Sequence, residues 1–261
     1  LEDLRAAFNH FHREGHVRVP IGVVLPSRPP SRERWLTRAE AARLVRHCWR
    51  FRERQNGATT RRFTRRHVAR FILIGLYAGR RAGAIVEAAL SPQAGRGWID
   101  LQRGIFHPRA RIMRTKKRQP PIRLPLRLLA HLRRWKRRGQ RYAVEWNDAP
   151  IRRIARAFRA AVRDTGLGTD VTPHTLRHTS ATWMMQRGAD PWAAAGYLGM
   201  SLETLIRTYG HHHPDHLKAA WGVFDRPGGE IKPGPKAKTG RKRPARAKKR
   251  KRRPPRRARR K

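Results

Sequence analysis

The excess of positive charge is the feature that most restricts what this chain can fold into. Its 261 residues contain 63 lysines and arginines against 17 aspartates and glutamates, a formal net charge of +46. Such a charge destabilises a compact body by self-repulsion unless a polyanion is nearby, and nucleic acid is the commonest cellular polyanion. We therefore expect a nucleic-acid-binding protein. An acidic membrane surface is a poorer partner, because no segment pairs a basic helical face with a tryptophan and leucine face.

The end of the chain concentrates this charge. Residues 226–261 carry 19 lysines and arginines and a single acidic residue, Glu230. After Ile231 the segment has no large apolar side chain, so it cannot bury enough surface to offset the entropy of ordering. We predict a disordered basic tail over 226–261. The preceding 225 residues still carry +28, so the folded body is basic as well.

The start of the chain resembles the end of another domain. Residue 1 is leucine, and an amphipathic helix with Leu4, Phe8 and Phe11 on one face begins at once. We expect the chain to be a fragment, with 1–19 the terminal helix of a truncated domain. A proline-rich linker over 20–34 and a main domain over 35–225 complete the predicted organisation.

Two features bear on the compartment. Cys48 is the only cysteine, so no internal disulfide and no thiolate cluster can form, which favours a reducing compartment. The longest apolar stretch, 71–79, is half of the roughly 20 residues that a membrane span needs. We therefore expect a cytoplasmic protein that does not insert into membranes.

The main domain has helical periodicity interrupted by one group of short strands. Thr37 and Glu40 form a capping-box pattern, and apolar positions over 68–76 predict a helix that Gly79 closes. Further helices are expected over 81–90, 126–135, 151–162, from Thr172 and Pro173 to Gly188, and from Asp190 and Pro191 onward. Short strands are expected at 98–101, 104–106, 110–114 and 122–124. The fold class is therefore mainly α with a small antiparallel β-sheet.

His174 and Arg177 stand three residues apart in the first turn of one predicted helix. A helix N-terminus offers free N–H groups and the positive end of the helix dipole, so these two side chains would complete a phosphate site. The alternative is a surface pair on a solvated basic face, since arginine is common throughout this chain.

The wider pattern resembles a known family. The runs PHTLRHTSATWMMQRG and YLGMSLETLIRTYGHHHPDH are similar to the C-terminal boxes of the tyrosine recombinases, or phage integrases. In that family a His-x-x-Arg pair is followed about 26 positions later by His or Trp, and nine further on by a nucleophilic tyrosine. Counting from His174 leads to position 200 and then to Tyr209. The run AGRRAGAI resembles the family's first arginine box, Thr-Gly-Leu-Arg-x-x-Glu-Leu, and places its arginine at Arg81.

The resemblance implies a catalytic set of Arg81, Lys117, His174, Arg177 and Tyr209. Spacing from Pro125 indicates Lys117 as the hairpin lysine, with Lys116 the adjacent alternative. Two guanidinium groups suit a phosphate gripped from different sides, and a lysine suits protonation of the leaving 5′ oxygen. His174 would accept the tyrosine proton and return it, and Tyr209 would form a 3′-phosphotyrosine. The alternative for Tyr209 is a half-buried core phenol.

Two positions depart from the family pattern. Met200 stands where the family has His or Trp, which removes one donor to the phosphate and predicts a slower enzyme. Ala84 replaces the acidic residue of the first box, which alters the support of Arg81. His211 is a candidate substitute for the missing donor. The cluster of His211, His212, His213 and His216 is a weak metal site because Pro214 interrupts it, and we expect no metal or other cofactor.

The resemblance implies a site-specific recombinase that acts on double-stranded DNA as a homotetramer. It also implies accessory DNA-bending or directionality proteins, a mobile-element origin in a bacterium or phage, and association with the nucleoid. Three alternatives stay open: an inactive DNA-binding relative, a type IB topoisomerase-like enzyme, and an RNA-associated basic protein. The last would need exposed aromatic platforms. We instead assign the tryptophans to helix core faces: Trp35, Trp135, Trp183 and Trp192.

Overall fold

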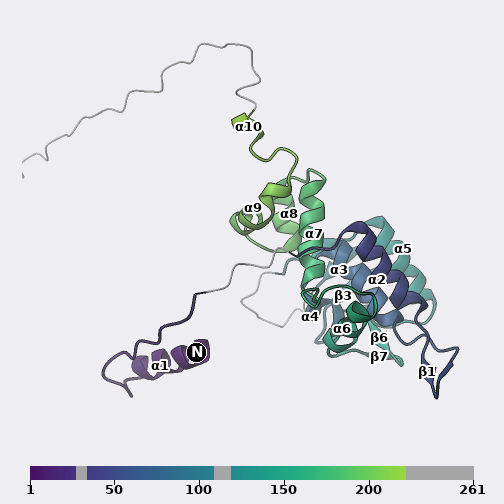
Figure 1. The fold of residues 1–261 in the computed structure, drawn as a ribbon, viewed down its shortest axis with the longest axis horizontal. Helices are drawn as coiled ribbons and strands as arrows, with labels where there is room; N and C mark the ends of the chain where they lie inside the picture. The colour runs from purple at the N-terminus through teal and green to yellow at the C-terminus, as the bar shows by residue number, and fades with distance from the viewer. Residues whose placement is uncertain (28–33, 109–118, 222–261) are drawn as a thin grey trace, which may run out of the picture. The chain divides into compact units, whose positions relative to one another are not determined.

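The structure is a computed structural model that describes residues 1–27, 34–108 and 119–221 (Figure 1). The predicted tail over 226–261, the predicted strand at 110–114, and Lys116 and Lys117 lie outside the described residues. The chain divides into two units at Leu217, and the second begins with α10 (Lys218–Trp221). No helix among the described residues is long and apolar enough to cross a membrane.

The predicted fold class is confirmed, because helices make up most of the regular structure and the strands are short and antiparallel. The helices of the first unit are α1 (Glu2–Arg13), α2 (Arg38–Arg50), α3 (Arg66–Ala78), α4 (Ala82–Val86), α5 (Leu126–Arg137), α6 (Ala155–Asp164), α7 (Thr175–Gln186), α8 (Pro191–Leu198), α9 (Leu202–Tyr209) and the 3₁₀ helix η1 (Gly210–His212). The strands are β1 (Arg54–Gln55), β2 (Ala58–Thr59), β3 (Trp98–Asp100), β4 (Ile105–His107), β5 (Ile122–Arg123), β6 (Glu145–Trp146) and β7 (Ala149–Pro150).

Local signals set several helix ends as predicted. At the start of α2, Glu40 N donates to Thr37 Oγ1 and Thr37 N donates to Glu40 Oε2, which completes the capping box. Helix α3 ends at Gly79, whose φ of +59° is the left-handed conformation that glycine adopts at low cost. Asp190 accepts from Ala193 N and caps α8, with Pro191 as its first residue.

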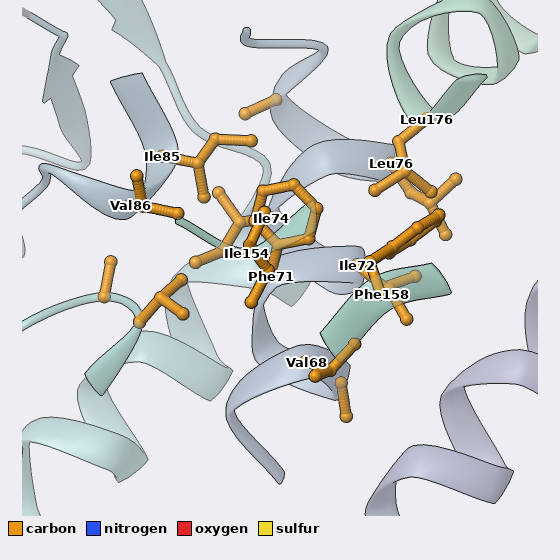
Figure 2. Packing of buried hydrophobic residues seen from close by; sticks show 14 of the residues in the cluster. Val68, Phe71, Ile72, Ile74, Leu76, Ile85, Val86, Ile154, Phe158 and Leu176 are labelled. Carbon is orange, nitrogen blue, oxygen red and sulfur yellow. The ribbon is translucent and has the colours of Figure 1, made fainter. Parts of the chain in front are cut away.

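The main core forms around α3, which packs against α2 and α7 and also contacts α4, α5 and α6. Figure 2 shows part of this core, in which Phe71 of α3 packs edge-to-face against Phe158 of α6. Each fully buried side chain of this size contributes about 1.5–3 kcal/mol relative to exposure. Ion pairing adds a link between the same helices, because Arg65 Nη2 lies 2.6 Å from Asp164 Oδ2.

A smaller apolar cluster joins α7, α8 and α9. It consists of Ala181, Met185, Ala194, Ala195, Leu198, Leu205 and Tyr209. Met200 packs against the edge of this cluster. The last turn of α9, with Tyr209 at its end, is therefore fixed by apolar packing.

The β-strands form three separate small sheets. Strands β3, β4 and β5 make the predicted antiparallel sheet, with Ile99 opposite Phe106 and Phe106 opposite Ile122. The hairpins β1–β2 and β6–β7 were not predicted. Their two-residue turns are Asn56–Gly57 and Asn147–Asp148, all with positive φ. Such pairs are typical of tight hairpins, so the signal was present in the sequence.

Three local predictions were wrong. Helix α7 begins at Thr175 instead of Pro173, because Thr172 and Thr175 form a turn in which Thr172 N donates to Thr175 Oγ1. Helix α4 ends at Val86 instead of position 90, since Ala89 pairs in β-fashion with Trp98 and Tyr142. Helix α6 begins at Ala155 instead of position 151.

The assignment of the tryptophans to the core holds in part. Trp135 is buried, and Trp35 and Trp183 are half-buried. Trp183 Nε1 also donates to the carbonyl oxygen of Leu36, which ties α7 to the segment before α2. Trp192 is 77% exposed, so its assignment to the core is wrong. It lies in the first turn of α8, where the helix faces solvent.

Candidate active site

The N-terminus of α7 carries the first two predicted site residues. His174 is the N-cap of this helix and Arg177 is its third residue, so both lie in its first turn. Two backbone N–H groups of this turn already have partners, because Thr175 N donates to the carbonyl oxygen of Thr172 and Arg177 N to that of His174. The helix dipole adds positive potential at this end. The first turn of α7 therefore combines the positive end of a helix dipole with a histidine and an arginine, and the helix begins two residues later than expected.

Arg177 is held by two backbone carbonyl groups. Its Nη1 atom donates to the carbonyl oxygen of Gly79 at 2.8 Å and to that of Leu198 at 2.6 Å. The side chain is only 5% exposed, and no carboxylate pairs with it in the described part of the chain. Burial, together with the charge of Arg81, lowers the pKa of Arg177 to about 10, which leaves it cationic at neutral pH. The guanidinium group is thus fixed where α3, α7 and α8 meet.

Arg81 lies at the start of α4, two residues after Gly79. Its positive charge contributes to lowering the pKa of both Arg177 and His174, so the three side chains share one neighbourhood. Burial is the larger cause for His174, whose pKa falls to about 4 even though part of the residue stays exposed. His174 is therefore neutral at physiological pH. Ala84, the departure from the family pattern, is buried inside α4.

Tyr209 is buried at the end of α9 with 6% of its surface exposed. Burial raises the pKa of its phenol to about 12, and the nearby charge of Arg177 opposes that rise. The phenol oxygen lies 2.6 Å from Nδ1 of His178, one turn along α7 from His174. The structure therefore combines both interpretations of Tyr209: the ring belongs to the core, while the hydroxyl group faces polar side chains.

His178 is a site residue that the sequence analysis missed. Its ring also lies edge-on to that of His174, with the ring centroids 4.7 Å apart. The signal was available, because residues four apart share one helix face and His178 follows His174 by four. Burial and the charge of Arg177 lower the pKa of His178 below its usual value.

Arg80 is a second residue that the sequence analysis did not single out. It is 3% exposed, and its Nη2 atom donates to the carbonyl oxygen of Pro120 at 2.8 Å. Burial lowers the pKa of Arg80 to about 10, and its Nε atom is buried without a hydrogen-bond partner in the described structure. The family's first arginine box, which the run AGRRAGAI resembles, has leucine at this position. The hydrogen bond from Arg80 to Pro120 therefore ties the start of α4 to the segment that leads into β5.

The structure brings together Arg81, His174, Arg177 and Tyr209, of which the first and the last are 128 residues apart in the chain. Met200 packs beside them on the apolar cluster that contains Tyr209. His211 lies in η1, two residues after Tyr209, and is exposed. Its ring lies against that of His212. Within 1–27, 34–108 and 119–221, no group of three or more histidine, cysteine or carboxylate side chains is arranged to hold a metal ion.

Comparison with known proteins identifies related sequences. Residues 34–216 match the model of the phage integrase family. A tyrosine recombinase XerD of Corynebacterium glutamicum is 38% identical over 64 residues, which cover 24% of this chain and 21% of that protein. A tyrosine recombinase XerC of Pelobacter propionicus is 36% identical over 88 residues, which cover 34% of this chain and 26% of that protein. The matched segments thus span about a fifth to a quarter of these relatives.

Solved structures share the fold at low sequence identity. A XerA recombinase is 22% identical with a TM-score of 0.50, over 85% of this chain and 74% of that one. The Tn1549 transposon integrase, solved in complex with a circular intermediate DNA, is 15% identical with a TM-score of 0.59, over 85% of this chain and 78% of that one. Both likenesses concern the helical architecture around the small sheet.

Proposed function

The chain belongs to the phage integrase family, and on that premise we propose that it is a site-specific DNA recombinase. In this proposal the phenol oxygen of Tyr209 attacks a DNA phosphodiester and holds the cut strand as a 3′-phosphotyrosine. The observation that carries the proposal is the convergence of Tyr209 with Arg177 and with the pair of Arg81 and His174. A core tyrosine without this role would have no need of a buried cation beside it at a helix N-terminus.

The two arginines stabilise the charge that grows on the nonbridging phosphate oxygens. Planar guanidinium groups hold a phosphate through paired N–H donors, and Arg177 is already fixed by the carbonyl groups of Gly79 and Leu198. Such preorganisation matters because the donors need not reorient during the reaction. His174, at the N-cap of α7, adds a further polar group on the same side.

The departing 5′ oxygen needs a proton, which we assign to Lys117, with Lys116 as the alternative. These lysines belong to the segment between β4 and β5. The step balances in protons and bonds: the Tyr209 O–H bond breaks and its proton passes to an imidazole of the site, an O–P bond forms, and the P–O5′ bond breaks as the lysine delivers its own proton to the 5′ oxygen. Reversal of these steps rejoins the strand.

The substrate in this proposal is double-stranded DNA at recombination sites, which is supported by similar structures that are complexes with DNA. The body is basic without the tail, which supports phosphate binding. We further propose a homotetramer on two duplexes, assisted by DNA-bending or directionality proteins, in the cytoplasm at the nucleoid. The domain assignment stays as proposed: 1–19 from a core-binding domain, a linker over 20–34, a catalytic domain over 35–225 and a basic tail over 226–261.

A second candidate is a DNA-binding relative without recombinase activity. Two observations favour it: Met200 supplies no donor to the phosphate, and Ala84 supplies no carboxylate near Arg81. Loss of one such donor commonly costs about a hundredfold in rate, which slows an enzyme without abolishing its chemistry. The two candidates differ in whether a covalent protein–DNA bond forms.

The test is covalent trapping on nicked duplexes tiled across the two ends of the mobile element that encodes the chain. A nick next to the cleavage point lets the short strand diffuse away and leaves the adduct trapped. We expect an adduct with the wild-type chain and with Tyr142→Phe, and none with Tyr209→Phe. Salt-dependent binding without any adduct would support the inactive relative, and an adduct with Tyr209→Phe would reject the role of Tyr209.

A further inference from the structure

The hydrogen bond between Tyr209 and His178 is the starting point for a further inference. The phenol oxygen lies 2.6 Å from His178 Nδ1, a short contact for two uncharged groups. Tyr209 is only 6% exposed, and His178 is half-buried. Water has little access to the phenol, so its proton must pass to a protein group when the oxygen attacks.

The charge states of the two groups are compatible with a phenol that donates this hydrogen bond. Burial keeps the pKa of Tyr209 near 12, so the phenol retains its proton at neutral pH. His178 has a lowered pKa and is neutral, so one ring nitrogen accepts and the other carries hydrogen. We take the phenol as the donor, so that His178 Nδ1 is the acceptor and Nε2 carries the ring proton.

His174 is less suited to receive this proton. In the described structure its side chain makes no hydrogen bond to Tyr209, and its ring instead contacts the edge of His178. Its neighbours are His178, Arg177 and Arg81, all of which disfavour an additional positive charge on it. His174 therefore lies towards the phosphate-binding arginines, and His178 lies towards the nucleophile.

We propose that His178 takes the proton of Tyr209 when the phenol attacks DNA and returns it when the strand is rejoined. The inference rests on the proposed function and assigns the tyrosine proton to a different residue from His174. In the forward step the O–H bond breaks, His178 becomes an imidazolium, the Oη–P bond forms, and the 5′ oxygen leaves with a proton from the lysine. The reverse step restores neutral His178 and the phenol.

Bound DNA makes this transfer more favourable. The titratable and charged groups that face His178 are His174 and Arg177 on its own helix and Tyr209 on α9. Arg177 disfavours an imidazolium in the free protein. A phosphate held by Arg177 would neutralise that charge, and an anion within about 4–6 Å favours the charged imidazole. Proton acceptance is thereby coupled to phosphate binding.

The first arm of the test needs no DNA. In the full chain labelled with ¹⁵N-histidine, we expect His178 to show a protonated Nε2 and an accepting Nδ1. Tyr209→Phe should shift the Nδ1 resonance of His178 and leave the His174 tautomer as it was. A response confined to His174 would overturn the inference, whatever the activity of the chain.

The second arm compares His178→Asn and His174→Asn in single-turnover cleavage of the nicked duplex that the wild-type chain traps. The asparagine amide oxygen can accept the phenol hydrogen near the position of Nδ1 but cannot take up a proton. We expect His178→Asn to cleave about 100-fold to 10,000-fold more slowly and to lose the fall in rate at acidic pH. We expect the cleavage rate of His174→Asn still to fall at acidic pH.

The control is His131→Asn on the exposed face of α5, which should cleave like the wild type. If His178→Asn cleaves at the wild-type rate and its rate still falls at acidic pH, the inference is overturned. The Tyr209 adduct, and so the proposed function, would stay in place. Absence of any adduct with the wild-type chain would overturn both. If His178→Asn fails to fold, His178→Gln is the replacement variant, and the first arm, in which His178 is intact, still decides.

Discussion

The Nη1 atom of Arg177 lies 2.8 Å from the carbonyl oxygen of Gly79, the residue that closes α3. This contact joins a buried cation to a backbone group whose direction is set by the left-handed conformation of the glycine. The placement of Arg177 therefore depends on a turn 98 residues earlier in the chain. It also explains why a helix-ending glycine stands beside the arginines of the site.

Substitution of Gly79 tests this dependence. In Gly79→Ala the new Cβ would lie 2.9 Å from Ser180 Oγ and closer still to Leu198 Cδ2, at a φ of +59°. Strain and overpacking together predict a loss of about 2–4 kcal/mol in the free energy of unfolding, measured by urea denaturation. The control is Gly83→Ala in α4, whose Cβ meets nothing within 4 Å and which should change stability by about 1 kcal/mol or less. Equal effects of the two substitutions would contradict this account.

Met200 is the position at which a lost function can be restored. The family pattern has a hydrogen-bond donor there, and Met200 packs next to the cluster that holds Tyr209. We expect Met200→His to raise the single-turnover cleavage rate by about tenfold to a hundredfold. Met200→Leu serves as the control without a donor and should cleave at the wild-type rate. If the histidine variant is no faster than the leucine variant, the proposed alignment of this position is wrong.

Arg80 carries a buried charge without a carboxylate partner in the described structure. Because such a charge is costly to bury, Arg80→Leu should raise the free energy of unfolding by about 1–3 kcal/mol. Cleavage should become slower, since Arg80 no longer holds the carbonyl of Pro120 in the segment that leads into β5. Arg80→Lys keeps the charge and should show no gain in stability. The measurements are urea denaturation and adduct formation, and a leucine variant less stable than the lysine variant would refute this reasoning.

The stability of the body should depend on pH between about 6.5 and 4. Burial lowers the pKa of His47, His67, His174 and His178 in the folded chain, and that of His67 and His174 falls to about 4. Well above pH 6.5 these groups are neutral in both states. As the pH falls, the unfolded chain gains protons that the folded chain cannot, so stability is lost.

Urea denaturation at steps between pH 7.5 and 4.5 measures this dependence. The hydrogen bond from Arg34 lowers the pKa of Glu40 to about 2, so that carboxylate adds to the loss only below about pH 4.5. His67→Phe, which keeps an aromatic ring against Trp146, should show a weaker pH dependence than the wild type. Stability that is constant or rising as the pH falls through this range would be inconsistent with histidines whose pKa is lowered in the folded chain.

Local features of the fold could be predicted from the sequence, because their causes lie within a few residues. The capping box of Thr37, the closing glycine of α3 and the Asp190–Pro191 start of α8 are of this kind. Helix α4 was predicted too long because Ala89 is paired with Trp98 and Tyr142, partners that no local pattern indicates. Long-range pairing therefore decided the boundary.

The candidate site shows the same contrast between features with local causes and features that depend on long-range packing. The spacing of His174, Arg177 and Tyr209 predicted a site at these residues. The carbonyl contacts of Arg177 and the partner of the Tyr209 phenol depend instead on how α3, α7, α8 and α9 pack. His178 was missed for this reason, since its role becomes visible only when α9 places Tyr209 beside α7. Arg80 could not be distinguished in the sequence from the many other arginines, because its burial depends on how the folded chain packs.

The polarity of the covalent bond decides whether Tyr209 acts as the nucleophile in DNA cleavage. Duplexes labelled on either side of the cleavage point are incubated with the wild-type chain, and the adduct is digested and mapped by mass spectrometry. We predict that the protein keeps the strand that ends in a 3′ phosphate, that a free 5′ hydroxyl is released, and that the modified peptide contains Tyr209. Attachment through a 5′ phosphate, or at any residue other than Tyr209, would contradict the account.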